Sequence, residues 1–535
     1  MPTKSLSKWI GWVLLLSALA YSLLWVVCGA GNPMDPFYWL TKYELLESGF
    51  MACGTIAIGH AWIALFGRTI CSMRVLGWLC TTAAVALPYC LLLDREQRRR
   101  NIHWLGLTYW LVGYGSFQEF SPGTISVLLL SLTVVMLFDK AAYRGRWLVW
   151  GLLLAALVLV RFPNILVLPI LLLYCCWPML RGERPWTDLL RDRRRELLLG
   201  IGCGALLYGL GLVGWYYGMH HAVAAPMARH TVLRMLQDMW KNGFRLVADI
   251  SLWAAFAYVL SQTGREMREV WRWLIAIAAG GAMLYYVFYA FAANQWYNMD
   301  QIYLISSLVL LVAIVLYAQR ERHTLPMPAV VFPVLIMSVA SLGTDMGLMK
   351  LFPALLCLLP WWAAYVYWAC RQRYVLLAMA VITPLFVVRF STNAIGRHDI
   401  FRENTWGQTD VMRFTRISDL DNEQMEQIVS DYETYSALAP VYAVGDKLHM
   451  VRALTHCHAP VKNEFWSNIF DPVYTKWYSE LVGREHPVIF CTFSPSFKTK
   501  PEYKDKHSRL EQMLLDSGYT AIDRSEFKYM IYEKK

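Results

Sequence analysis

Long apolar runs constrain this chain of 535 residues more than any other feature of its sequence. The runs at 10–27, 75–93 and 374–390 come close to the roughly 20 residues that a helix needs to cross a bilayer. Hydrophobic residues make up 57% of the chain, whereas soluble domains hold roughly 45–50%. Repeated runs of this kind predict a polytopic α-helical membrane protein with about 12 spans.

Charge divides the chain into two parts. From Ser391 onward there are 18 Lys and Arg against 21 Asp and Glu, a net charge of −3, although the whole chain carries +11. The residues before Ser391 therefore hold a net +14, mostly in short loops between apolar runs. Membrane proteins carry such an excess in their cytoplasmic loops, so the basic character indicates topology and not nucleic-acid binding.

Short elements with turns between them predict a soluble domain at 391–535. Its expected helices are 423–437 and 510–517, with Gly518 as the C-cap of the second, and its expected strands are 441–445, 488–493 and 528–533. About 140 residues suffice for an independent core. The predicted architecture is a transmembrane domain at 1–390 followed by a small α/β soluble domain.

Basic loops predict which side of the membrane each end faces. Lysines precede the first span, and short Arg-rich loops recur at 181–195, 265–272, 320–322 and 371–373. These loops are expected in the cytoplasm. The N-terminus is then cytoplasmic and the C-terminal domain lies outside.

One Arg-rich segment conflicts with this orientation. If Met51–Phe66 crosses back, Gly67–Arg74 is a cytoplasmic turn, and Asp94–Arg100 with its four Arg falls outside. A half-spanning segment near Trp104–Gly115 restores the count. Alternatively, these arginines lie outside and meet a phosphate, and the sequence leaves both explanations open.

The stretch Gly31–Phe50 places acidic residues directly after the first span. Charge near hydrocarbon is costly, so these acids need a reason. In a structural interpretation, Asp35 and Pro36 begin a helix, and Glu44 and Glu47 share its wet face. In a functional interpretation, Asp35 is a catalytic base held at the membrane surface, and the two glutamates bind substrate or support the base.

Polar residues also stand where later apolar runs break. Arg161 precedes Phe-Pro-Asn between two runs, and it is either a snorkelling end residue or a phosphate ligand. His221 and Arg229 lie in the polar stretch 220–245, which is either an interfacial amphipathic helix or a contact for a lipid phosphate. Asp345 lies in another turn predicted outside. We treat all four as candidate substrate-binding residues.

Cysteine usage predicts neither a disulfide framework nor a zinc site. Ten of the twelve Cys precede Ser391, mostly in apolar runs, where Cys behaves as a small apolar residue. Cys457 and Cys491 pair only if the C-terminal domain faces an oxidising compartment. The His-Cys-His motif around Cys457 lacks the spaced partner ligands of a zinc site.

The glycines of Gly200-x-Gly-x-Gly204 imitate a dinucleotide-binding fingerprint. No strand precedes them, and they lie inside an apolar run. Close packing of one helix on another explains them better.

The order of features near the N-terminus resembles that of a known class of enzyme. The motifs, within residues 9–180, are the loop with Asp35, Leu65-Phe-Gly-Arg68, Arg74-Val-Leu-Gly77, Phe117-Gln-Glu-Phe-Ser-Pro-Gly123 and Arg161-Phe-Pro-Asn164. They resemble the GT-C class of membrane glycosyltransferases, which take sugars from polyprenyl-phosphate carriers. The resemblance implies that Asp35 is the catalytic acidic residue of a first outer loop at 28–50, and that Glu119 is a second acid or a metal ligand. The paired Asp-Asp or Asp-x-Asp of several members is missing, so the metal requirement stays open; oxygen ligands favour magnesium or manganese if a metal is used.

The resemblance implies transfer of a hexosyl or pentosyl group in a bacterial inner membrane. The expected partners are a polyprenyl-phosphate-linked donor, membrane lipids and a glycan, lipid or protein acceptor, without nucleic acid. Three other functions stay open: a transporter or flippase, an enzyme of the O-antigen polymerase or ligase type, and a non-catalytic scaffold. A transporter usually shows paired broken helices and an internal repeat, whereas this sequence shows one break.

Overall fold

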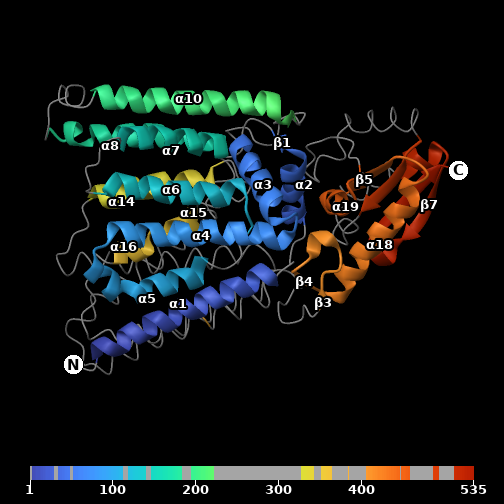
Figure 1. The fold of residues 1–535 in the computed structure, drawn as a ribbon, viewed down its shortest axis with the longest axis horizontal. Helices are drawn as coiled ribbons and strands as arrows, with labels where there is room; N and C mark the ends of the chain where they lie inside the picture. The colour runs from blue at the N-terminus through green and yellow to red at the C-terminus, as the bar shows by residue number, and fades with distance from the viewer. Residues whose placement is uncertain are drawn as a thin grey trace. The chain divides into compact units, whose positions relative to one another are not determined.

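The computed structural model describes the chain in segments. These are residues 3–28, 34–48, 52–112, 119–139, 146–182, 194–221, 327–342, 351–363, 384, 405–445, 447–457, 486–492 and 511–534. The chain is mostly helical and carries a small sheet near its C-terminus (Figure 1). Two compact units interleave along the sequence: unit 1 is Met1–Trp25, Leu76–Leu212 and Ala228–Arg397, and unit 2 is Val26–Val75, Val213–Met227 and His398–Lys535. The predicted boundary between residues 390 and 391 lies outside the described segments.

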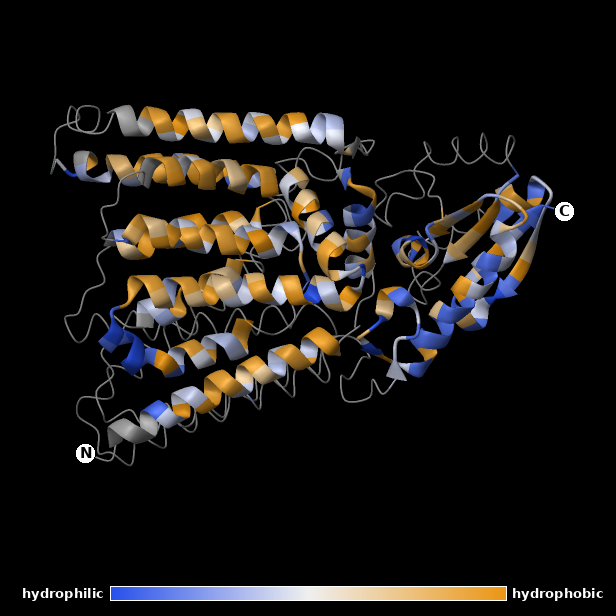
Figure 2. Cartoon of the chain, in the orientation of Figure 1, coloured by the Kyte–Doolittle hydropathy of each residue, from blue (hydrophilic) through white to orange (hydrophobic). Residues whose placement is uncertain are grey.

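Unit 1 consists of apolar helices. Its main helices are α1 (Thr3–Val27), α4 (Ile70–Leu92), α5 (Arg95–Val112), α6 (Pro122–Phe138), α7 (Arg146–Val160), α8 (Val167–Leu180), α10 (Arg194–Gly218) and α14 (Met327–Ser338), of which α1, α4 and α10 continue into unit 2. The shorter helices η2 (Phe162–Leu166), η4 (Val339–Ser341), α15 (Leu351–Leu356) and α16 (Leu359–Ala363) join them. Apolar residues cover most of α4, α6, α7 and α10 (Figure 2).

Three helices of the described segments are long and apolar enough to cross a membrane. They are Lys8–Val27, Ile70–Leu92 and Leu198–Gly218. Many of their apolar side chains are exposed, as lipid-facing side chains are. The chain is therefore a membrane protein. The predicted total of about 12 spans stays a prediction, because several of the expected spans lie outside the described segments.

Helices α1 and α5 run in the same direction. A Cβ on Gly11 of α1 would touch His103 of α5, and six residues further along α1 the Trp110 indole donates to the Ser17 hydroxyl at 3.1 Å. Contacts therefore advance together along both helices. The Arg-rich start of α5 lies at the same end of the bundle as the start of α1.

Helix α4 runs opposite to both. Its early residue Trp78 donates to the hydroxyl of Ser22, late in α1, at 2.8 Å. Tyr109, late in α5, donates to the carbonyl of Thr82 in the middle of α4 at 2.7 Å, and Tyr89, late in α4, donates to the carbonyl of Arg98, early in α5. The chain thus leaves through α1, returns through α4 and leaves again through α5.

The predicted span Met51–Phe66 is shorter than a helix that crosses a bilayer. It forms α3 (Cys53–Phe66), whose 14 residues give a length of about 21 Å against a hydrocarbon core of roughly 30 Å. Arg68, just beyond α3, lies with its Nε 2.7 Å from Glu44 Oε1 and donates to the carbonyl of Ala453. The turn after α3 therefore lies beside the acidic stretch.

This correction removes the conflict over Asp94–Arg100. With α3 on one side, α4 is the returning span, and the four Arg lie at the same end as the N-terminus. The half-span predicted near Trp104–Gly115 is not needed either, because its described part, up to Val112, belongs to the continuous helix α5. The basic loops then follow the positive-inside rule throughout this region.

The glycines of α10 serve close helix packing. A Cβ on Gly204 would come within 2.7 Å of the carbonyl oxygen of Gly151 in α7. A Cβ on Gly151 would in turn collide with the backbone of Gly200. Gly202 faces open space, so the packing uses two of the three glycines.

The C-terminal part of unit 2 is an α/β fold. Its elements are β3 (Thr405–Trp406), η7 (Asp410–Met412), β4 (Arg416–Ile417), α18 (Asp419–Ser436), β5 (Val441–Gly445), α19 (Leu448–Thr455), β6 (Val488–Thr492), β7 (Tyr519–Arg524), η8 (Ser525–Phe527) and β8 (Tyr529–Lys534). The larger sheet has the order β5-β6-β8-β7; β5 and β6 are parallel and the other pairs antiparallel. The predicted strands are confirmed as β5, β6 and β8, with ends shifted by at most one residue, and the predicted helices as α18 and the helical residues 511–516; the sequence did not predict α19, β7 or the short strands β3 and β4.

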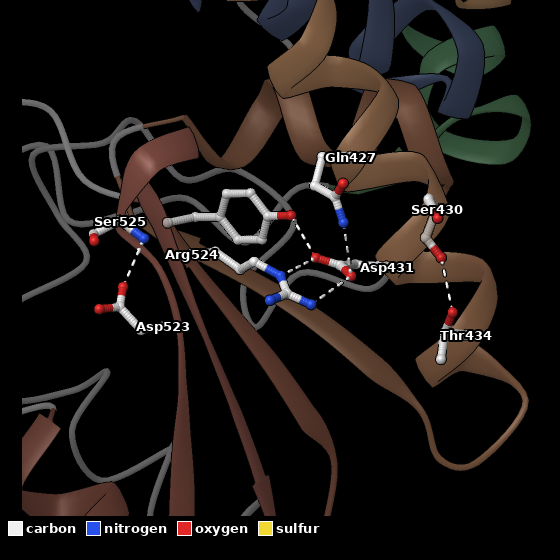
Figure 3. Close-up of polar contacts among 8 residues, drawn as sticks. Gln427, Ser430, Asp431, Thr434, Asp523, Arg524 and Ser525 are labelled. Carbon is white, nitrogen blue, oxygen red and sulfur yellow. Dashed lines mark hydrogen bonds and ion pairs between the residues drawn. The ribbon is translucent and has the colours of Figure 1, made fainter.

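Asp431 ties α18 to the sheet (Figure 3). Its Oδ2 accepts from Arg524 Nε at 2.9 Å and from the Tyr529 hydroxyl at 2.6 Å, and its Oδ1 accepts from Arg524 Nη2 and Gln427 Nε2, each at 3.2 Å. The carboxylate is buried, and both of its oxygens are paired. Such a network fixes the packing of the helix on the sheet.

Candidate functional site

Asp35 lies in the first turn of α2 (Met34–Leu45). The sequence predicts that Asp35 and Pro36 begin a helix, and the helix begins at Met34, one residue earlier. The side chain of Asp35 is outside the described residues, so its role as base stays a prediction. Helix α2 follows the end of the spanning helix α1 after six residues.

Helix α2 is held in unit 2 by its apolar face. Phe37, Leu40 and Tyr43, spaced three residues apart, are at most 1% exposed. They pack in the region where α2 contacts α19 and α3. Gly59 of α3 permits this approach, because a Cβ there would lie 2.5 Å from the Tyr43 ring. Burying three such side chains contributes roughly 1.5–3 kcal/mol each.

Glu44, predicted to bind substrate, lies in a small cluster of ion pairs. Its Oε1 is 2.7 Å from Arg68 Nε and 3.2 Å from His456 Nδ1. The His456 side chain is more than half exposed, and the Arg68 and Glu44 side chains are about one fifth exposed. The cluster therefore stands in partial contact with solvent, where a ligand can reach it.

Glu47 is buried, and its predicted place on the wet face of a helix is wrong. It lies beyond α2 in the short strand β1 (Glu47–Ser48), and it is 3% exposed. Its Oε1 lies 3.1 Å from Nη2 of Arg452, which α19 carries and which is also buried. A buried carboxylate needs such a partner, so the contact with the C-terminal domain explains its position.

His221 also reaches this region through the backbone. The strand β2 (His220–His221) pairs in parallel with β1, which sets Glu47 opposite His220 and Ser48 opposite His221. The side chains of both histidines are outside the described residues. The structure thus brings together the backbone of the first outer loop and the segment after α10.

Lys42 lies beside the Glu47–Arg452 pair and is also buried. Its ammonium group stands 4.8 Å from the centre of the Tyr38 ring. Burial lowers the pKa of Lys42 from 10.5 to about 8, Glu47 acts in the raising direction, and Arg452 adds to the lowering. The three side chains therefore interact electrostatically.

Arg161 and Glu119 lie in unit 1. The Arg161 guanidinium donates to the carbonyls of Ala340, at 3.0 Å, and of Leu342, at the end of η4. The carbonyl end of a helix attracts a cation, so a structural role accounts for this buried arginine. The Glu119 carbonyl accepts from the Thr124 hydroxyl at 2.6 Å and supports the start of α6.

A side-chain contact places these two residues at the same end of α6. Asn164, directly after the break, donates to the Ser126 hydroxyl in the first turns of α6 and to the Leu157 carbonyl, both at 2.9 Å. The sequence motif Phe-Pro-Asn therefore closes the end of α7 against α6. Neither contact tests a role of Glu119 or Arg161 in substrate binding, and that role stays a prediction.

The predicted site residues fall into three groups. Unit 2 holds Asp35, Glu44, Glu47 and His221; unit 1 holds Glu119 and Arg161; Arg229 and Asp345 lie outside the described residues. Sequence reasoning missed Lys42 and Arg452. A lysine on the apolar side of α2 was a signal for the first, and no local signal marked the second.

The described segments contain neither a cluster of metal ligands nor a disulfide. No group of three or more His, Cys, Asp or Glu stands there in a position to hold a metal ion. Cys457 and Cys491 are both buried, and neither forms a disulfide. Burial raises the pKa of the Cys457 thiol to about 11, so it stays protonated at neutral pH.

Comparisons with known proteins give similar solved structures. Two are crystal structures of ArnT from Cupriavidus metallidurans, and both are 12% identical to this chain and cover 98% of it. The structure in the apo state has a TM-score of 0.44, and 97% of its own chain is covered. The structure bound to undecaprenyl phosphate has a TM-score of 0.45, and 98% of its own chain is covered. A third is the Archaeoglobus fulgidus oligosaccharyltransferase in the apo form, with 11% identity and a TM-score of 0.44, over 90% of this chain and 69% of the other. No family model and no curated protein matches the sequence.

These solved structures share little sequence with this chain. With identities of at most 12% and TM-scores below 0.5, they do not indicate what this chain binds or transfers. The proposal below therefore rests on the residues of this chain.

Proposed function

We propose that this protein is a membrane glycosyltransferase that moves a sugar from a polyprenyl-phosphate carrier to a glycan, lipid or protein acceptor. The observation that supports this most is the placement of α2. It carries Asp35 in its first turn, follows a spanning helix, and is held in a compact unit by the ion pairs of Glu44 and Glu47. Asp35 thus belongs to a helix that starts where the chain leaves the bilayer.

The three acidic residues of the first outer loop have different roles in this proposal. Glu44 and Glu47 are both engaged in ion pairs with arginines in the structure. Asp35 is the acid of α2 that we assign to chemistry. Arg68 is partly exposed and, like His456, contacts Glu44 Oε1; its guanidinium suits the phosphate of the carrier.

The reaction follows from these assignments. The Asp35 carboxylate takes the proton of the acceptor hydroxyl while that oxygen attacks the anomeric carbon of the donor sugar. The bond between the anomeric carbon and the phosphate oxygen breaks, and polyprenyl phosphate leaves with the bonding electrons. Arg68 stabilises the negative charge of the departing phosphate. Glu119 is proposed as a second acid, and magnesium or manganese as the metal if one takes part.

The proposed orientation follows from the corrected path of the chain. Helix α1 leaves the basic N-terminus, and its end at Cys28 pairs with Arg416 of the C-terminal domain. We place the N-terminus in the cytoplasm of a bacterial inner membrane and the C-terminal domain outside. A reporter that is active only in the cytoplasm, fused after Lys535, contradicts this orientation if it is active.

Asp35→Asn tests the function. Asn caps a helix about as well as Asp, so a structural role predicts normal expression and normal transfer. The catalytic role predicts normal expression and a loss of transfer of about 10²–10⁴-fold. The measurement is transfer from a radiolabelled polyprenyl-phosphate sugar in membranes, with Glu96→Gln at the other end of the bundle as the control. An active Asn variant removes the assignment of Asp35.

A further inference from the structure

Three charged side chains meet where α2 contacts α19. Lys42 comes from α2, Glu47 from β1 and Arg452 from α19, and each is at most 6% exposed. Two cations thus share one carboxylate in a buried place. Charges removed from water need compensation, so Glu47 is the group on which the balance of this cluster depends.

The Tyr38 ring of α2 lies against the Lys42 ammonium. Other titratable groups on α2 and the helices packed against it are Glu44 on α2, His449 on α19 and His456 at its end, and His60 on α3. Glu47 and Arg452 both act on Lys42 through their charge. Glu44 is engaged with Arg68 and His456, so it does not replace Glu47 as a partner.

Arg452 ties this cluster to the C-terminal domain. It lies 405 positions from Glu47 in the sequence, and it sits on the short helix α19 directly after the sheet strand β5. The same helix places His449 edge-on against the Tyr38 ring, with 4.7 Å between ring centres. Helix α19 therefore contacts α2 one turn after Asp35 and again beyond its C-terminal end.

We propose that Glu47 and Arg452 are positioning residues for the transfer reaction: through them the C-terminal domain fixes α2, and with it Asp35, against the membrane surface. This inference rests on the proposed function of Asp35. It assigns to the C-terminal domain a part in assembling the site, although that domain contributes no group to the reaction. Misplacing a reacting group by about 1 Å lowers rates by roughly a hundredfold, so the effect is measurable.

The charge count predicts an unequal effect of the two partners. Without Arg452, one lysine and one carboxylate remain, which form a neutral pair. Without Glu47, two buried cations remain side by side, and α2 and α19 repel each other. Glu47→Gln is therefore the damaging change, and Arg452→Gln is the mild one.

The test compares full-length variants at equal folded amounts in detergent. They are Glu47→Gln, Arg452→Gln, the double variant, and Asp431→Asn as a control that disturbs the C-terminal domain away from α2. We expect kcat to fall about tenfold to a hundredfold in Glu47→Gln, less in Arg452→Gln, and to recover in the double variant. We expect Asp431→Asn to keep its kcat once the folded amount is matched.

A pH series separates positioning from general damage. Because Glu47 raises the pKa of Lys42, that pKa falls further in Glu47→Gln, so Lys42 loses its charge as the pH rises and the repulsion ends. The defect of Glu47→Gln is then smaller near pH 9 than near pH 7. A defect that is equal at both values, or a double variant no better than Glu47→Gln, overturns the proposal. One outcome separates this proposal from the proposed function. If Asp35→Asn is active, and Glu47→Gln still lowers the unfolding temperature more than Arg452→Gln or the double variant does, the proposed function fails and the contact between Glu47 and Arg452 stands.

Discussion

Unit 2 contains two buried carboxylates that each face an arginine, and they differ in how well they are satisfied. Asp431 accepts four hydrogen bonds, and its pair with Arg524 is neutral. Glu47 meets Arg452 through Oε1, its Oε2 has no hydrogen-bond partner among the described residues, and Lys42 adds a second cation. A complete network rigidifies a domain, whereas an unbalanced one makes a contact sensitive to charge. The first belongs inside the C-terminal domain and the second at the helix that carries Asp35.

The largest expected effect is the loss of stability when either buried carboxylate is replaced by an amide. Removing one partner of a buried pair costs about 3–5 kcal/mol, and Glu47→Gln is expected at the upper end because two cations remain. Asp431→Asn is expected to cost about 2–3 kcal/mol, since Arg524 is about one third exposed and water solvates it. Thermal unfolding of the purified protein in detergent measures both. An equal loss in the two variants contradicts the comparison.

The pH dependence of stability tests Lys42 next. Its pKa is lowered from 10.5 to about 8, so between these values the unfolded chain binds a proton that the folded chain has released. The free energy of unfolding therefore rises with pH across this window, by at most about 1.4 kcal/mol per pH unit. Unfolding midpoints recorded at pH values from about 7 to 10.5 check this.

Lys42→Met is the matched control for that series. It removes the titrating group and keeps an unbranched side chain in the same place. The difference between wild type and Lys42→Met isolates Lys42 from tyrosines and cysteines that titrate in the same range. A difference that stays constant over the window refutes the buried, titrating Lys42.

Tyr529→Phe tests how the hydrogen-bond network of Asp431 is held together. It removes one hydrogen bond from Asp431 and leaves the two bonds from Arg524. The expected loss is about 1 kcal/mol. Chemical unfolding followed by tryptophan fluorescence measures it; a loss as large as that of Asp431→Asn means that the tyrosine, and not the arginine, carries the network.

The smallest expected effect comes from an exposed pair. Glu96 and Arg100 are four residues apart at the start of α5, and both side chains are more than half exposed. Glu96→Gln is expected to change stability by about 0.5 kcal/mol or less. A larger shift in the same unfolding assay indicates that the start of α5 is held by its charges and not by packing on α1.

The elements themselves could be predicted from the sequence. The strand Val441–Gly445 has its predicted bounds, α18 contains nearly all of 423–437, and the long spans α1 and α4 follow from their apolar runs. Periodicity and composition are local properties, so they identify such elements well.

The partners of these elements could not be predicted. The apolar run of α3 is of intermediate length, and its place is decided by Arg68, which meets Glu44 and the Ala453 carbonyl. Glu47 looked like a residue of a wet helix face, yet its partner stands 405 positions away. Such contacts depend on tertiary structure, and no local pattern contains them. The roles of Asp35, Glu119, Arg161, Arg229 and Asp345 stay predictions.

The interleaving of unit 2 has a consequence for biosynthesis. The first outer loop emerges early, but Arg452 is made about 400 residues later, which takes roughly 20–80 s at ordinary rates of translation. During that time Lys42 and Glu47 have no α19 to cover them. The packing of α2 against α19 is then completed only when nearly the whole chain exists. A truncated chain that stops inside the membrane domain therefore inserts without acquiring a finished site.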